Sequence, residues 1–191
     1  MGIPVVSAQV FSFMADIRTP RPVLLLIAVC SRHDQALDWS AQRAESKYGP
    51  IELRSDAFEF NQTDYYERSM GVGLKKQFLA FRTLIDPGQL RHIKRETNAW
   101  EAEFARQTDW SEERPLNLDP GYVSEAKLVL ASTKDHAHRI YLDDGIFAEV
   151  TLHYQGGRWQ KSSWTYPDYQ QSDFQEFFLR CRGFLRGEMR K

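Results

Sequence analysis

The run Val23-Leu24-Leu25-Leu26-Ile27-Ala28-Val29 is part of the longest apolar stretch in the chain, which reaches Cys30. It has the length of a β-strand and is far shorter than the roughly 20 residues that a membrane-spanning helix requires. Its unbroken, branched composition is typical of a central strand that is covered on both faces. We therefore expect a sheet with this strand in its interior, and no transmembrane helix.

The segments around this strand alternate between helical and extended patterns. Residues 31–48 have helical spacing and stop at Gly49-Pro50, while 51–60 and 74–84 are plausible strands. A long second helix should start at the Asp86-Pro87 cap, and a phenylalanine-rich helix should begin near Ser172. The sequence thus predicts an α+β domain with a mixed, largely antiparallel sheet, ferredoxin-like or related, with helices packed on it.

Two phrases of similar sequence suggest one more helix. Leu84-Ile-Asp-Pro-Gly88 is echoed by Asn117-Leu-Asp-Pro-Gly121. By analogy, Asp119 should cap a helix that begins at Pro120. Its inward residues would be Val123, Ala126, Leu130 and Thr133.

Residues 136–154 are typical of a β-hairpin with a turn at Asp143-Asp144-Gly145. A three-residue loop with Gly145 in the left-handed region gives chemically matched pairs across the strands. These pairs are Leu142 with Ile146, Ile140 with Ala148, His138 with Val150, Tyr141 with Phe147, and Arg139 with Glu149. In this register His136 and His138 lie on the inward side with Ile140, on the opposite face from Arg139 and Glu149.

Composition and charge restrict the class of protein. A chain of 191 residues with 42% hydrophobic and 13% aromatic residues can bury its own core. We expect a loosely ordered extension over residues 1–16, with Met14 as an alternative start, and one domain over residues 17–191.

The near-zero net charge of -1 indicates neither a nucleic-acid nor a membrane partner. Two cysteines, Cys30 and Cys181, suit buried thiols in a reducing, cytoplasmic compartment.

The stretch from Asp119 to Tyr169 holds most of the candidate functional residues. We assign His138, Glu149 and Asp119 as candidate catalytic groups, with His138 as acid or base. The candidate ligand-binding residues are Lys127, Lys134, Arg139, Asp168 and Tyr169. Asp135, His136 and His138 could hold a divalent metal, although a metal is not the favoured cofactor.

Each assignment has a structural alternative. The histidines could be hydrogen-bonded residues at a frayed strand end. Arg139 and Glu149 could form an exposed ion pair worth under about 1 kcal/mol instead of an anion site. The chain contains no Walker loop, Gly-x-Ser-x-Gly, Cys-x-x-Cys or His-Glu-x-x-His motif, which argues against the common enzyme classes that use them.

Many phrases along the chain can be matched to one family. They include Pro20-Arg-Pro-Val-Leu-Leu, Lys47-Tyr-Gly-Pro-Ile51, Thr63-Asp-Tyr-Tyr-Glu67, Leu84-Ile-Asp-Pro87, Asn117-Leu-Asp-Pro-Gly-Tyr122, His138-Arg-Ile-Tyr-Leu142, Ala148-Glu-Val-Thr-Leu152 and Trp164-Thr-Tyr-Pro-Asp-Tyr169. In these phrases the chain resembles the bacterial domain of unknown function 4416 family from about Ile17 onward. The resemblance implies a bacterial, cytoplasmic, single-domain protein, and it implies no reaction or catalytic residue.

Two functions therefore stay open at the level of sequence. The first is a cytoplasmic binder of a small anionic or nucleotide-type ligand, which could be an enzyme. The second is a non-catalytic interaction or structural domain that uses the aromatic loops at Tyr65-Tyr66 and Trp164 to Tyr169 as its contact surface.

Overall fold

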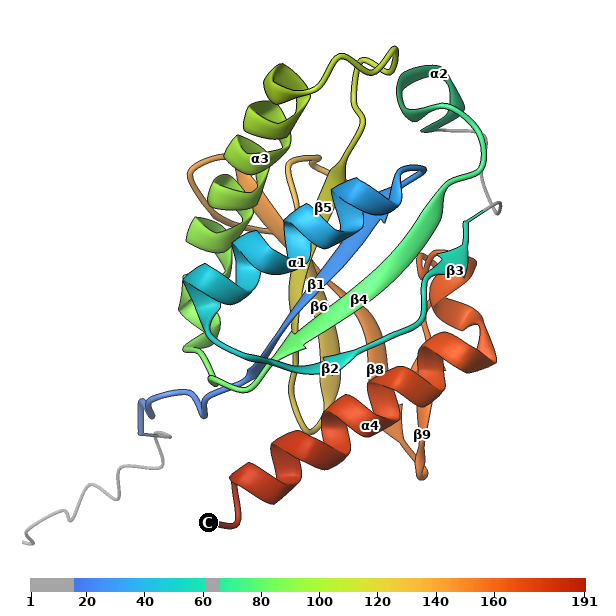
Figure 1. Ribbon diagram of the computed structural model, residues 1–191. Helices are drawn as coiled ribbons and strands as arrows, with labels where there is room; N and C mark the ends of the chain where they lie inside the picture. The colour runs from blue at the N-terminus through green and yellow to red at the C-terminus, as the bar shows by residue number, and fades with distance from the viewer. Residues whose placement is uncertain (1–15, 61–65) are drawn as a thin grey trace, which may run out of the picture.

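The computed structural model describes residues 16–60 and 66–191, and these form an α+β fold around one nine-stranded sheet (Figure 1). The extension expected over residues 1–16 lies almost entirely outside the described residues, as do Met14 and Tyr65. The first elements are β1 (Leu24–Ser31), α1 (Asp34–Tyr48), β2 (Ile51–Arg54), β3 (Phe58–Glu59), α2 (Glu67–Met70), β4 (Lys75–Phe81), η2 (Pro87–Gln89), α3 (Leu90–Gln107) and β5 (Asn117–Val123). The chain continues through β6 (Lys127–Ser132), β7 (Ile140–Asp143), β8 (Ile146–Gln155), β9 (Arg158–Lys161), η3 (Asp168–Gln170) and α4 (Ser172–Glu188).

The first half of the chain has ferredoxin-like connectivity. The elements β1, α1, β2, β4, α3 and β5 follow one another in βαββαβ order, and their strands lie side by side as β2-β4-β1-β5. Every strand pair among the described residues is antiparallel. The ferredoxin-like expectation is therefore confirmed, with β3 and α2 as a small insertion before β4.

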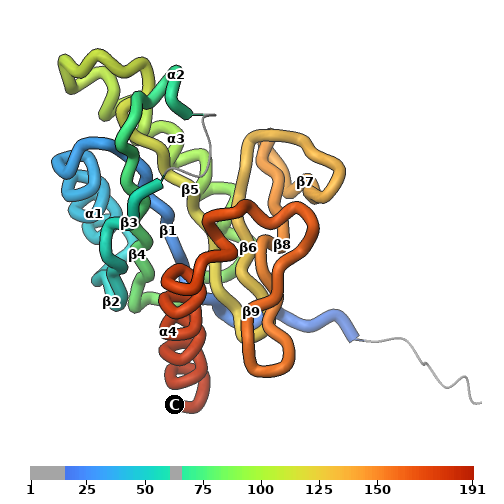
Figure 2. Tube along the Cα trace, turned by 90° about the vertical axis from the view of Figure 1, so that its right-hand side faces the viewer, coloured from blue at the N-terminus to red at the C-terminus, as the bar shows by residue number. Residues whose placement is uncertain are grey.

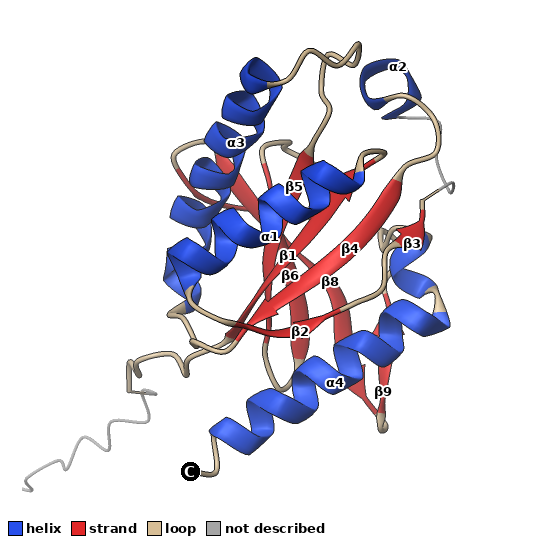
Figure 3. Cartoon of the chain, in the orientation of Figure 1, coloured by secondary structure: helices blue, strands red, loops and turns tan. Residues whose placement is uncertain are grey.

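The central position of β1 is confirmed as well, because all eight of its residues are buried. Leu25, Ile27 and Val29 pack with apolar residues of α1 and α3. Leu24 and Leu26, on the other face, pack with the phenylalanines of α4. Figure 3 shows α1 and α3 over one part of the sheet and α4 apart from them, near β3 and β9.

The second half of the chain extends the sheet beyond β5 in the order β6-β8-β7. Strands β7 and β9 pair with successive parts of the long strand β8, and Figure 2 shows them at its two ends. The predicted pairs Ile140 with Ala148 and Tyr141 with Phe147 are present. The turn differs from the prediction, because Asp144 and Gly145 both have positive φ (54° and 75°) and the register shifts between Tyr141 and Asp143. The turn therefore has two residues, Asp144 and Gly145, and a bulge at Leu142 precedes it. The predicted pair of Leu142 with Ile146 is wrong, because Asp143 pairs with Ile146 instead.

Two expectations for this half are wrong. Asp119 caps no helix, because residues 117–123 form β5 and the next segment forms β6. The two histidines do not lie on a strand, because β7 begins only at Ile140 and residues 136–139 form a turn. Ile140 is also not inward, since it is 74% exposed on the edge strand.

In the part of the chain that the structure describes, no helix combines the length and the apolar composition needed to cross a membrane.

Candidate functional site

A cavity of about 470 Å³ lies where β6 separates from β5. The two strands pair from Val123↔Leu128 to Gly121↔Leu130, and no pairing is recorded beyond that point. Residues from several elements meet around the opening: β4, β5, β6, β8, α3, the turn before β7 and the loop that leads into η3. The charged side chains lining it are Lys76, Lys94, Arg114, Lys134 and Arg139, with Asp119, Glu149 and Asp168, and the aromatic ones are Phe60, Tyr66, Tyr166 and Tyr169.

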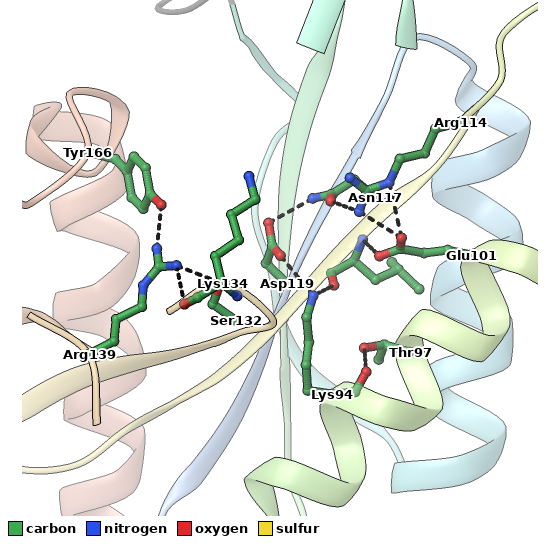
Figure 4. Close-up of polar contacts among 11 residues, drawn as sticks. Lys94, Thr97, Glu101, Arg114, Asn117, Asp119, Ser132, Lys134, Arg139 and Tyr166 are labelled. Atoms are coloured by element: carbon green, nitrogen blue, oxygen red, sulfur yellow. Dashed lines mark hydrogen bonds and ion pairs between the residues drawn. The ribbon is translucent and has the colours of Figure 1, made fainter. Parts of the chain in front are cut away.

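Asp119 on β5 forms one wall of the cavity. Its Oδ1 accepts a hydrogen bond from the buried Lys94 ammonium (3.0 Å), and its Oδ2 accepts one from the Asn117 amide (2.7 Å) (Figure 4). Although burial alone would raise it, Lys94 and Asn117 together lower the pKa of Asp119 to about 2. Asp119 is therefore an ionised hydrogen-bond acceptor at neutral pH.

Behind this wall, side chains of α3 hold the backbone of β5. Lys94 Nζ donates to the carbonyl oxygen of Leu118 (2.7 Å), and Glu101 Oε1 accepts from the Leu118 N–H (2.7 Å). Arg114 pairs with Glu101 (2.7 Å) and also donates to the side chain of Asn117. Burial raises the pKa of Glu101 above its ordinary value, against the opposing effect of Lys94 and Arg114. These contacts fix the position of Asp119 from the helix side of the sheet.

Arg139 fixes the opposite wall. Its Nε donates to Glu149 (2.8 Å), and the side chains of both residues are almost fully buried, at 3% and 2% exposure. Its other nitrogens donate to Ser132 Oγ (2.8 Å), the Lys134 carbonyl oxygen (3.0 Å) and the Tyr166 hydroxyl (2.7 Å). A guanidinium has five N–H donors, and these contacts use four of them. Arg139 is therefore mainly a positioning residue that joins β8, the turn and the loop of Tyr166.

The turn held by Arg139 carries two further cavity residues, Lys134 and His136. The backbone of Lys134 is fixed at both ends, because its N–H donates to Ser132 Oγ and its carbonyl oxygen accepts from Arg139. Its residue surface is exposed, and in Figure 4 its side chain extends between the Arg139 wall and the Asp119 wall. His136 is exposed and lines the same cavity.

His138 meets Glu149 but does not line the cavity. Its Nε2 lies 3.1 Å from Glu149 Oε2, and its ring stacks between His136 (5.8 Å) and Trp164 (5.4 Å). His138 and Arg139 thus reach the same carboxylate, which the strand prediction had placed on the opposite face from His138. A turn removes the strict alternation of side chains that separates neighbours on a strand.

No metal site results from these histidines. Among residues 16–60 and 66–191, no group of three or more His, Cys, Asp or Glu side chains is arranged to hold an ion. The third proposed ligand, Asp135, is exposed in the turn.

Asp168 and Tyr169 close the cavity from the η3 side. Asp168 Oδ2 forms a buried ion pair with Lys76 Nζ (2.5 Å). The same ammonium lies over the rings of Phe60 (4.0 Å) and Tyr169 (5.2 Å). Burial raises the pKa of Tyr169 and Tyr166, so both hydroxyls stay protonated and can donate hydrogen bonds.

The structure therefore gathers seven of the predicted residues around one cavity: Asp119, Lys134, His136, Arg139, Glu149, Asp168 and Tyr169. It places Lys127 at the opposite end of β6, beside a separate cavity of about 280 Å³. Lys76, Lys94, Arg114 and Asn117 were missed by the sequence reasoning. Lys94 offered one usable signal, because it lies four residues after Leu90 and three before Thr97, on the face of α3 that is otherwise predicted to be buried.

Comparisons with known proteins extend this description only to the level of the family. Neither the curated proteins nor the solved structures gave a significant match. The family model described as Domain of unknown function (DUF4416) matches residues 21–184, which include the whole βαββαβ unit and every residue that lines the large cavity. The chain belongs to this family of domains of unknown function.

Proposed function

We propose that the protein binds a small anionic ligand in the cavity between β5 and β6. One observation carries this proposal: among the residues that the structure describes, five lysine and arginine side chains line the cavity, against three aspartate and glutamate side chains. An excess of cations in a partly enclosed site attracts and orients an anion more strongly than the same charges would on an open surface.

The size and the aromatic lining support a nucleotide-type ligand. About 470 Å³ is within the range of roughly 300–1,000 Å³ that is typical of small-molecule sites. Tyr66, Tyr166 and Tyr169 combine apolar ring surface with a polar hydroxyl, and His136 presents a further ring at the end of the His136–His138–Trp164 stack. Such rings can pack against a planar base or a sugar.

Lys134 and Lys127 provide a matched pair of variants for a test. Both are exposed lysines, and they lie at the two ends of the same strand region, but only Lys134 lines the large cavity. We expect inorganic phosphate or AMP at ten times its dissociation constant to stabilise the wild-type protein by about 1.4 kcal/mol. For a chain of this length that stabilisation raises the unfolding midpoint by roughly 3–6 °C.

Thermal unfolding measured with and without these ligands gives the result. Lys134→Ala should lose most of the shift, whereas Lys127→Ala should keep it. An equal loss in the two variants would point to non-specific charge attraction and would contradict a site in the cavity.

A second candidate function is a non-catalytic interaction domain. It is favoured by the exposure of Trp164 (40%) and Tyr166 (45%) beside the cavity. Both side chains are anchored, however, because Trp164 Nε1 donates to the Val150 carbonyl oxygen and Tyr166 accepts from Arg139. This candidate would take precedence if phosphate, AMP and divalent metals all left the wild-type midpoint unchanged.

We also propose the bacterial cytoplasm as the place of action. The family resemblance suggested a bacterial protein, and both cysteines are buried free thiols, which suits a reducing compartment.

A further inference from the structure

Building on the proposed anion site, we propose that the ligand is a hydroxyl-bearing phosphate ester, such as a sugar phosphate or a nucleotide, whose hydroxyl group donates to Asp119. The anionic group would then lie toward Lys134, and the hydroxyl would lie on the opposite wall.

Asp119 differs from the other two carboxylates of the cavity in its exposure. The side chains of Glu149 and Asp168 are only 2% and 3% exposed and are covered by their cationic partners. The side chain of Asp119 is 30% exposed although it is paired with Lys94. Among the carboxylates of the described residues that line the cavity, Asp119 is therefore the one with the most exposed side chain.

The protein contacts of Asp119 also leave acceptor capacity. Oδ1 accepts from Lys94 and Oδ2 accepts from Asn117, and each carboxylate oxygen can accept two hydrogen bonds. An ionised carboxylate has no proton to donate and repels an anion. A ligand group bound here must therefore be a donor, and a sugar hydroxyl is a neutral donor of suitable size.

The two walls give the site a polarity that an anion alone does not explain. In Figure 4, Asp119 and its partners lie on one side of the Lys134 side chain, and Arg139 and Tyr166 lie on the other. Lys134 and Asp119, which would contact the two ends of the ligand, lie on different elements and are held by separate hydrogen bonds. A ligand with an anionic end and a hydroxyl-bearing end satisfies both walls at once.

The test compares ligands and variants by isothermal titration calorimetry. The ligands are methyl phosphate, which has no hydroxyl outside its phosphate group, ribose 5-phosphate, and AMP. The variants are Asp119→Asn and the control Asp144→Asn. Asp144 is a carboxylate on the β7–β8 turn, outside the cavity, and asparagine tolerates its positive φ.

We expect the wild-type protein to bind ribose 5-phosphate or AMP at least tenfold more tightly than methyl phosphate. Asp119→Asn should remove at least tenfold of that preference while methyl phosphate binds as before or more tightly. Asp144→Asn should change neither value.

Two outcomes would overturn different statements. Equal wild-type affinity for methyl phosphate, ribose 5-phosphate and AMP would overturn the hydroxyl proposal and leave the anion site intact, and this comparison holds even if Asp119→Asn fails to fold. No binding of any of the three ligands to the folded wild-type protein would overturn the proposed anion site itself.

Discussion

Replacement of Arg139 by methionine should destabilise the protein strongly, because it leaves Glu149 without its main partner. The Glu149 side chain is 2% exposed and accepts from Arg139 Nε at 2.8 Å. A buried carboxylate cannot regain hydration when its partner is removed, and breaking such a pair typically costs about 3–5 kcal/mol. Methionine keeps much of the arginine volume, so the loss reports on the charge and the hydrogen bonds instead of a cavity.

The expected effect on thermal unfolding follows from the size of the chain. At roughly 2–4 °C per kcal/mol for a chain of this length, Arg139→Met should lower the midpoint by about 6–20 °C. Glu149→Gln should cost less, because Arg139 would still donate to Ser132, Lys134 and Tyr166.

Urea unfolding of the two single variants and the double variant measures the coupling between these side chains. The double variant should be more stable than the sum of the two single losses predicts, since no unpaired charge remains. Arg82→Met is the matched control, because Arg82 Nε donates to Glu52 at 2.7 Å but its side chain is 68% exposed. It should cost under about 1 kcal/mol.

A loss of less than about 1 kcal/mol in Arg139→Met, equal to that in Arg82→Met, would refute this reasoning. The pair would then behave as the exposed cross-strand ion pair that the sequence also allowed.

Two further predictions concern β5. Gly121→Ala should destabilise the protein by about 1–3 kcal/mol in urea unfolding, because a Cβ there would lie 2.2 Å from the Val129 carbonyl oxygen. The control Gly183→Ala, in α4 with open space around it, should instead stabilise the protein by about 0.5–1 kcal/mol. Stabilisation by both substitutions would contradict the close approach of β6 to Gly121. The folded pKa of Asp119, about 2, lies below its ordinary value of 3.8, so its stabilising contribution is present above about pH 4 and lost as the pH falls toward 2. The stability difference between wild type and Asp119→Asn should shrink across that interval in unfolding experiments, and a constant difference would contradict the ionised, paired carboxylate.

The sequence predicted the fold well where burial is simple. The run from Val23 to Val29 is buried on both faces, as its unbroken apolar composition indicated. The face of α3 that contains Leu90, Ile93 and Trp100 is also buried as its spacing predicted. In these elements hydrophobic periodicity and tertiary packing favour the same structure, so local pattern is sufficient.

The prediction failed where one local phrase is compatible with two structures. Asp86 does accept from the Gly88 N–H (2.7 Å) and precedes η2 and α3, as the Asp-Pro-Gly phrase indicated. Asp119 precedes the same two residue types and lies in the middle of β5. The difference is set by long-range pairing with β1, from Leu24↔Val123 to Cys30↔Asn117, which no local pattern contains.

The candidate site was predicted in part for the same reason. Arg139 and Glu149 do form the expected pair, although Arg139 lies in the turn before β7 and not on the strand, because only ten residues of chain separate them. Lys94 and Asp119 are 25 residues apart and meet only after α3 packs on β5. Contacts of this kind depend on the assembled fold, so no spacing along the chain predicts them.

Pro120 explains why the cavity forms at this place in the sheet. Residues alternate in the direction of their backbone groups along a strand, so Leu118, Pro120 and Tyr122 all turn their backbone toward the β6 side. Tyr122 pairs with Val129 on β6, but Pro120 has no N–H to donate, and the pairing stops at Gly121↔Leu130. Leu118 therefore needs other partners, and the Lys94 ammonium and the Glu101 carboxylate of α3 supply them at 2.7 Å each.

At Leu118, side chains of α3 replace β6 as the hydrogen-bond partners of β5, and this replacement links the architecture of the sheet to the chemistry of the site. The ammonium of Lys94, a residue of α3, is buried against β5, where the Leu118 carbonyl oxygen lacks a partner on β6. Once in that position, it also donates to Asp119 and keeps this carboxylate ionised at the cavity wall. Where Pro120 ends the β5–β6 pairing, the Lys94 ammonium thus lies beside Asp119, and the separation of the two strands leaves the cavity in which we propose that an anion binds.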